Sequence, residues 1–141
     1  MAEQLEATVT LKNQKVQFTG ETRSNPPITF DYNPPLGDGK GYTGLEGLLV
    51  SLAACSATSV VALLRKMGKH VSGFKVNAKG LRRDQHPTSF NKIFLEFVLN
   101  SRDAKDKDVQ KAVQLSEESI CPVWAMIKGN VEILTDYKII P

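Results

Sequence analysis

The sequence predicts a single α+β domain over residues 1–141, and three observations support this. Segments with the two-residue alternation of β-strands occupy residues 7–32 and recur after residue 70. A long uncharged segment with helical character separates these two groups of strands, and two further helices precede the last strand. Because the strands are grouped and do not alternate one by one with helices, the pattern indicates α+β and not α/β architecture.

Three strands are predicted before the central helix, at residues 7–11, 16–22 and 28–32. In each, β-branched or aromatic residues alternate with polar ones. Residues 12–14 have the polar composition of a turn between the first two strands. Proline and glycine crowd residues 33–41, which disfavours both helix and strand there and predicts a loop.

The central helix is predicted to begin at Thr43 and to end near Met67, where Gly68 stops it. Thr43 and Glu46 have the spacing of a capping box, in which each side chain bonds the backbone amide of the other residue. Glu46 therefore has a structural explanation as a helix cap.

Residues 47–64 of this helix carry no charge. A membrane span needs about 20 apolar residues, but serine, threonine and cysteine dilute the apolar character here, so we predict no membrane span. We expect a long central helix buried on nearly all sides. A single sheet covers only one face of a helix, so a second subunit is the simplest cover for the other face. A stripe of small residues at helical spacing, Ser51, Cys55, Thr58 or Ser59, and Ala62, predicts a homodimer through this helix.

The second half of the chain predicts strands at 71–78, 90–99 and 131–140. The second of these is expected to place Ile93, Leu95, Phe97 and Leu99 on one face. An amphipathic helix is expected from Asp106 to about Ile120, with Val109, Ala112, Val113, Ser116 and Ile120 on its apolar face. Pro122 ends that helix at Cys121 and suits the first position of a short helix over 122–128.

The composition excludes several function classes. Hydrophobic residues make up 41% and charged residues 23% of the chain, as in ordinary globular proteins. The net charge of +3 is spread along the chain without a basic block, so nucleic acid is not an expected partner. The N-terminal residues lack the pattern of a signal peptide, which predicts a cytoplasmic protein. His70 and His86 have no metal-ligand spacing with either cysteine, so neither a metal nor another cofactor is expected.

The two cysteines, Cys55 and Cys121, are the candidate reactive residues. Cys55 lies in the middle of the apolar helix, where a cysteine often serves as a small hydrophobic residue. Cys121 lies at the start of the helix opened by Pro122, a position that favours a thiolate but also suits an inert capping residue. Only a fold that brings the two together makes them a redox pair.

Two cysteine motifs resemble those of the OsmC/Ohr family (osmotically inducible protein C and organic hydroperoxide resistance protein). The stretch 44–57, GLEGLLVSLAACSA, is similar to the central-helix motif of this family, and 115–123, LSEESICPV, to its second-cysteine motif. The order of elements fits over essentially the whole chain. The segments 18–21 and 103–115 look closest to the YhfA-like branch, whose function is poorly defined.

The resemblance implies an OsmC-like fold, with curved antiparallel sheets around the central helices of an intertwined homodimer. It also implies a thiol-dependent peroxidase that reduces organic hydroperoxides in oxidative stress defence. Cys55 would be the peroxidatic cysteine and Cys121 the resolving one, with a dithiol reductant restoring both thiols. Phe18, Met67, Trp124 and Met126 would line an apolar pocket or simply belong to the core.

The sequence departs from the family peroxidases at two positions. Those enzymes stabilise the reactive thiolate with an arginine from an N-terminal turn, and a glutamate at the start of the central helix holds that arginine. The corresponding turn, 12–15, has lysines but no arginine. Glu46 is the candidate glutamate, although at about 100° per residue it lies opposite Cys55 on a regular helix. These departures keep two alternatives open: a slow or non-catalytic dimer that binds a small apolar ligand, and a thiol redox sensor.

Overall fold

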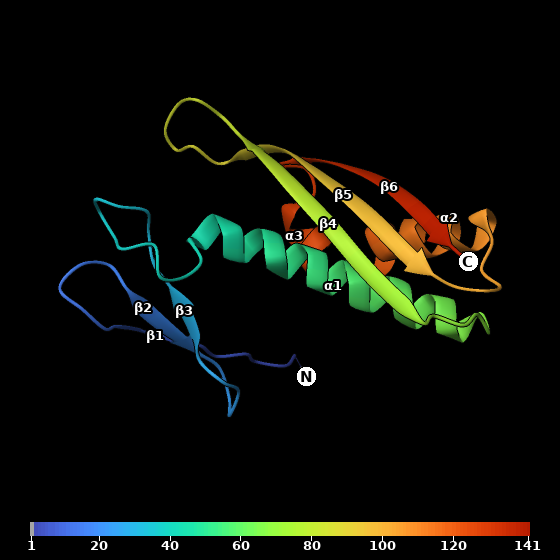
Figure 1. The fold of residues 1–141 in the computed structure, drawn as a ribbon, viewed down its shortest axis with the longest axis horizontal. Coiled ribbons are helices and arrows are strands. Elements are labelled where there is room, and N and C mark those ends of the chain that lie inside the picture. Colours follow the sequence, from blue (N-terminus) through green and yellow to red (C-terminus); the bar gives the residue numbers. More distant parts are fainter. Residues whose placement is uncertain (1) are drawn as a thin grey trace. The chain divides into compact units, whose positions relative to one another are not determined.

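The computed structural model describes residues 2–141, which form two compact units, Met1–Leu48 and Leu49–Pro141. The elements follow in the order β1 (Thr8–Leu11), β2 (Phe18–Glu21), β3 (Ile28–Phe30), α1 (Gly44–Lys66), β4 (Gly73–Arg82), β5 (Phe90–Asn100), α2 (Asp106–Leu115), a π-helical turn (Ser116–Ile120), α3 (Pro122–Ile127) and β6 (Glu132–Ile140). Figure 1 shows these elements along the chain. The mixed helix and strand content with two sheets confirms the predicted α+β class.

The first unit is built on a three-stranded antiparallel sheet in the order β1-β2-β3. The turn between β1 and β2 is held by Asn13, whose Oδ1 accepts hydrogen bonds from the amides of Lys15 and Gln17 at 3.0 and 3.1 Å. This is the predicted turn, and it fixes the antiparallel register of the two strands.

The loop after β3 is organised by the buried carboxylate of Asp31. It accepts hydrogen bonds from the backbone amides of Tyr32, Asp38 and Lys40. The Lys40 amide makes the largest contribution to lowering the pKa of Asp31, against the opposing effect of burial. Proline and glycine prevent regular structure here, so a side chain supplies the hydrogen bonds that a strand partner would otherwise supply.

The second unit contains the sheet β4-β5-β6 with helices on one of its faces (Figure 1). Alternate β5 residues, Ile93, Leu95, Phe97 and Leu99, are buried on that face, as predicted. The other face carries partly or fully exposed side chains. The core of this unit is completed from the helices by Leu52, Val60, Leu64, Val109, Ala112 and Trp124.

The expectation of antiparallel sheets is wrong for this sheet, because β5 and β6 run parallel. Parallel neighbours cannot be joined by a tight turn and need a long crossover. The chain between β5 and β6 supplies it through α2, the π-helical turn and α3. The sheet is therefore mixed, with the antiparallel pair β4-β5 on one side.

The second predicted helix also differs from its expected form. An α-helix covers only Asp106–Leu115, and Ser116–Ile120 form a π-helical turn. Ile120, expected on the apolar face, is 51% exposed, while Ser116 is buried as predicted. The wider π turn rotates the residues after Leu115 relative to an α-helix, which explains why the α-helical period fails for Ile120.

Within residues 2–141, helix α1 is buried on one face, and the burial of its other face by a second subunit remains a prediction. The buried face carries Leu52, Ser56, Ser59, Val60 and Leu64. By length and composition α1 could span a membrane, yet 28% of its most apolar stretch is buried.

The predicted small-residue stripe is divided between the two sides of the helix. Ser51, Thr58 and Ala62 are exposed, whereas Cys55 is half-buried and Ser59 is buried. The exposed small residues, with Ala54 among them, therefore form a face that the described part of the chain leaves uncovered.

Candidate active site

Cys55 and Cys121 are brought together in the second unit, although they are far apart in the sequence. Cys55 is half-buried on α1, and Cys121 is 2% exposed between the π-helical turn and α3. Both are free thiols. Burial is the main cause that raises the pKa of the Cys55 thiol, and the neighbouring Cys121 thiol raises it further. A backbone hydrogen bond from Val123 opposes both effects.

Local backbone geometry fixes the position of Cys121. The Cys121 amide donates to the Ser116 carbonyl at 2.9 Å, which closes the π-helical turn. Because proline follows, Cys121 takes an extended conformation with ψ at 110°. Its sulfur then accepts a hydrogen bond from the Trp124 amide at 3.4 Å. The predicted capping position of Cys121 is thus confirmed.

Ser56 is a residue of this site that the sequence analysis did not single out. It is fully buried, and its Oγ lies 3.8 Å from the Sγ of Cys121. It lies within the 44–57 motif, but a serine next to Cys55 in a helix full of small residues has no distinguishing pattern of its own. Ser116, also buried, meets this segment through its backbone carbonyl, which accepts the hydrogen bond of the Cys121 amide.

Glu46, the third predicted site residue, belongs to the first unit and is engaged as a helix cap. Its Oε1 accepts from the Thr43 amide at 2.9 Å, and its own amide donates to Thr43 Oγ1 at 3.2 Å. These are the two hydrogen bonds of the predicted capping box. A catalytic role for Glu46 remains a proposal.

The turn between β1 and β2 carries lysines and no arginine, so it lacks the arginine expected from the resemblance to the family peroxidases. Lys15 pairs with Asp38 at 2.7 Å, with both side chains largely exposed. Arg23 occupies a left-handed backbone conformation with φ at 53° in the following turn. The charge of Lys15 is thus already balanced within the first unit.

An open apolar depression of about 390 Å³ lies on the first unit. Its lining consists of Val9, Val16, Phe18, Phe30, Asp31, Tyr32, Leu36 and Gly44. Of the four predicted pocket residues, only Phe18 lines this depression. Met67 is half-buried at the end of α1, Trp124 is buried in the core of the second unit, and Met126 is 74% exposed.

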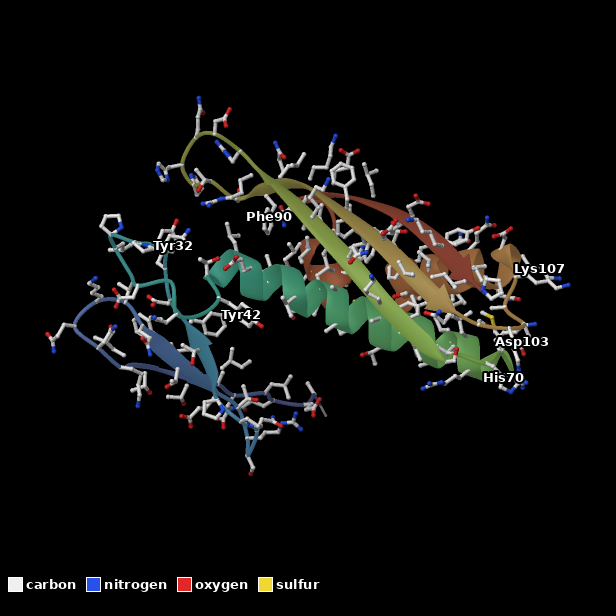
Figure 2. All side chains as sticks on the ribbon, in the orientation of Figure 1. Tyr32, Tyr42, His70, Phe90, Asp103 and Lys107 are labelled. Atoms are coloured by element: carbon white, nitrogen blue, oxygen red, sulfur yellow. The ribbon has the colours of Figure 1, made fainter. Side chains whose placement is uncertain are left out.

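A polar cluster at the far end of α1 joins His70 to the loop after β5. His70 Nδ1 lies 2.8 Å from Asp103 Oδ2, and the His70 amide donates to Asp103 Oδ1 at 2.9 Å. Figure 2 shows His70 and Asp103 side by side. Arg102 Nη2 contacts His70 Nε2 at 2.9 Å. His70 and His86 are both exposed. Residues 2–141 contain no group of three or more metal-ligating side chains.

Comparison with known proteins identifies the family. Residues 37–136 match the family model described as OsmC-like protein. The chain is 36% identical to Protein YhfA of Escherichia coli (strain K12) over 123 residues, which cover 87% of this chain and 90% of YhfA. The matched range includes the whole of α1.

Solved structures share the whole fold. A hypothetical protein from Aquifex aeolicus VF5 has a TM-score of 0.86 and 30% identity, and the match covers 99% of this chain and 98% of that one. An OsmC-like protein from Mycoplasma pneumoniae has a TM-score of 0.84 at 20% identity, with 100% of both chains covered. The organic hydroperoxide resistance protein OhrB of Bacillus subtilis has a TM-score of 0.64 at 16% identity, covering 96% and 98%. The sequence match over most of the chain and the shared architecture establish that this protein belongs to the OsmC-like family.

Proposed function

We propose that this protein is a cysteine-based thiol peroxidase that reduces organic hydroperoxides as a defence against oxidative stress. The single observation that carries the proposal is the meeting of Cys55 and Cys121 in the second unit, with a half-buried and a buried thiol side by side. The fold shared with proteins named for organic hydroperoxide resistance adds support at the level of architecture. A cytoplasmic location, where thiols are kept reduced, is part of the same proposal.

The chemistry proceeds through the two sulfurs. The Cys55 thiolate attacks one peroxide oxygen, the O–O bond breaks, and the leaving alkoxide takes a proton to become an alcohol. Cys55 is then a sulfenic acid. The Cys121 thiolate attacks the Cys55 sulfur, releases water after proton transfer, and forms a disulfide. A dithiol reductant restores both thiols by exchange and is itself oxidised to a disulfide.

Cys55 is the better candidate for the first step because it is the more exposed of the two sulfurs. Its raised pKa lowers the thiolate fraction at neutral pH, so the reaction is expected to be slow without a nearby cation. Glu46 is the candidate to hold such a cation, as the resemblance to the family peroxidases implies. It would do so in addition to capping α1.

The proposal includes a homodimer. The exposed face of α1 carries Ser51, Ala54, Thr58 and Ala62, and Val50 beside it is 53% exposed. An exposed apolar face on a helix favours burial against a partner, and small residues allow close approach of a second helix. A second copy of the chain is the proposed partner.

The test uses reduced protein and one equivalent of cumene hydroperoxide, followed by intact mass and peptide mapping without reductant. The proposal predicts the loss of two hydrogens and a peptide that links Cys55 to Cys121. Cys121→Ser should stop at a sulfenic acid on Cys55, and Cys55→Ser should not react. Free thiols after this treatment would refute the peroxidase.

A second candidate function is binding of a small apolar ligand without fast turnover. It is favoured by the raised pKa of Cys55 and by the open apolar depression of the first unit. This candidate predicts that a fluorescent apolar probe binds the Cys55→Ser protein as well as the parent. A thiol redox sensor predicts instead that disulfide formation changes the oligomeric state or probe binding.

A further inference from the structure

The hydroxyl of Ser56 is directed differently from those of its neighbours on α1. Thr58 and Ser59 donate to the carbonyl oxygens four residues earlier, at 2.9 and 3.1 Å, as hydroxyls in helices often do. Ser56 is fully buried, and its hydroxyl lies 3.8 Å from the sulfur of Cys121. A buried hydroxyl needs a hydrogen-bond partner, and for Ser56 this partner is the Cys121 sulfur.

The direction of this hydrogen bond depends on the state of the sulfur. When Cys121 is a thiol, either group can donate. When it is a thiolate, the sulfur can only accept, so the Ser56 O–H must donate. The Trp124 amide already donates to the same sulfur at 3.4 Å. A Cys121 anion would therefore receive two donors, one from α1 and one from α3.

The two sulfurs also differ in accessibility. Cys55 is half-buried, while Cys121 is 2% exposed. An external thiolate therefore reaches Cys55 more readily than Cys121. In disulfide exchange the rate depends both on which sulfur is accessible and on how well the departing sulfur carries negative charge.

We propose that Ser56 sets the direction of thiol–disulfide exchange at the Cys55–Cys121 pair by stabilising Cys121 as the departing sulfur. The inference rests on the proposed function, in which the two cysteines form a disulfide. One thiolate of a dithiol reductant attacks Cys55 Sγ, the S–S bond breaks, and its electron pair leaves on Cys121 Sγ, which the Ser56 hydroxyl and the Trp124 amide then stabilise.

The remaining steps balance with the same reductant. The second thiolate of the dithiol attacks the reductant sulfur that is bonded to Cys55, which closes the reductant's own disulfide. Cys55 leaves as a thiolate, and both protein sulfurs take up protons from solvent. Two electrons have then passed from the dithiol to the protein disulfide.

Ser116 provides a matched control. It is 1% exposed, and within residues 2–141 its hydroxyl is buried without a hydrogen-bond partner. Ser56→Ala and Ser116→Ala thus remove the same atom from two equally buried serines in one unit. Only Ser56→Ala removes a contact to the Cys121 sulfur.

The experiment oxidises each protein to the disulfide with diamide, so that no peroxide is needed, and follows its reduction by dithiothreitol. We expect reduction of Ser56→Ala to be about threefold slower than that of the parent, because its departing sulfur is less stabilised. Ser116→Ala should be unchanged. With excess monothiol and an acid quench, peptide mapping of the parent should find the adduct on Cys55. Equal rates in the parent and Ser56→Ala, or an adduct on Cys121, would overturn the inference.

A second measurement reports on the Cys121 thiolate alone. In the Cys55→Ser background Cys121 is the only cysteine, since the chain has two. The thiolate absorbance of this protein should appear at a higher pH when Ser56→Ala is added, and at the same pH when Ser116→Ala is added. Ser56→Thr, which keeps a hydroxyl at this position of the helix, should leave that pH unchanged. If diamide forms the disulfide and these differences hold while cumene hydroperoxide does nothing, the peroxidase fails but the role of Ser56 stands.

Discussion

Thr43 and Glu46 satisfy each other's backbone amides at the start of α1, at distances of 2.9 and 3.2 Å. The central helix therefore begins where two side chains close a capping box. Glu46 thus has a structural role as a helix cap. Variants of Thr43 and Glu46 can separate this role from a catalytic one.

Thr43→Ala should lower the free energy of unfolding by about 1 kcal/mol, the typical cost of losing an N-cap side chain. Glu46→Gln keeps an acceptor for the Thr43 amide, so it should cost less. Urea unfolding of the two variants and the parent measures both. If Glu46→Gln leaves stability intact but greatly slows peroxide reduction, Glu46 acts in catalysis. If activity follows stability across both variants, Glu46 is only a cap.

The rate of peroxide reduction should rise with pH. The pKa of Cys55 is raised above 9.0, mainly by burial, and only its thiolate attacks the peroxide. The rate constant should therefore increase about tenfold per pH unit between about pH 7 and 9. Stopped-flow measurement with cumene hydroperoxide tests this. A plateau already reached at neutral pH would show that a cation lowers the pKa of Cys55 in the working protein.

The contact between His70 and Asp103 should stabilise the fold above the acid range. The His70 side chain and amide hold the pKa of Asp103 at about 2, below its ordinary 3.8. A lowered pKa stabilises the folded state above pH 3.8, and this contribution is lost as pH falls from about 4 to 2.

Asp103→Asn should therefore lower the midpoint of thermal unfolding at neutral pH, and the difference from the parent should shrink at pH 2. Asp84, in the exposed loop between β4 and β5, supplies the control Asp84→Asn. A deficit of the Asp103→Asn protein that persists unchanged at pH 2 would exclude the ionised carboxylate as its cause.

Leu64→Ala should destabilise the second unit strongly. Leu64 is fully buried on α1, and truncation of a buried leucine costs about 2–5 kcal/mol. Leu81→Ala, at a position on β4 that is 46% exposed, is the matched control and should cost far less. If denaturant unfolding gives equal losses of unfolding free energy for the two variants, the face of β4 that carries Leu81 is covered in solution.

Thr58→Arg should weaken the proposed homodimer. Thr58 is exposed at the middle of the small-residue face of α1, where a large charged side chain would prevent close packing of a second helix. Gln114→Arg, on the exposed face of α2, introduces the same charge elsewhere. Sedimentation velocity should find the parent and Gln114→Arg dimeric and Thr58→Arg monomeric. A monomeric parent at micromolar concentration would remove the dimer from the proposal.

The local elements were predictable because their causes are local. The capping box at Thr43 and Glu46, the turn at Asn13 and the end of α1 before Gly68 depend on residues within one turn of the chain. Alternation along β5 likewise predicted its buried face. The π-helical turn at Ser116 was missed because the apolar spacing that predicts an α-helix does not signal a single wider turn, which shifts the face of the residues after Leu115.

The sequence by itself determined the α+β class, the element order, the uncharged central helix and the two cysteine motifs, since all follow from neighbouring residues and their periodicity. Only the tertiary structure decided that β6 runs parallel to β5, that Ser56 faces Cys121, and that the half-buried Cys55 meets the buried Cys121. These relations join residues far apart along the chain. They depend on how the crossover from β5 to β6 packs against α1, which no local pattern records.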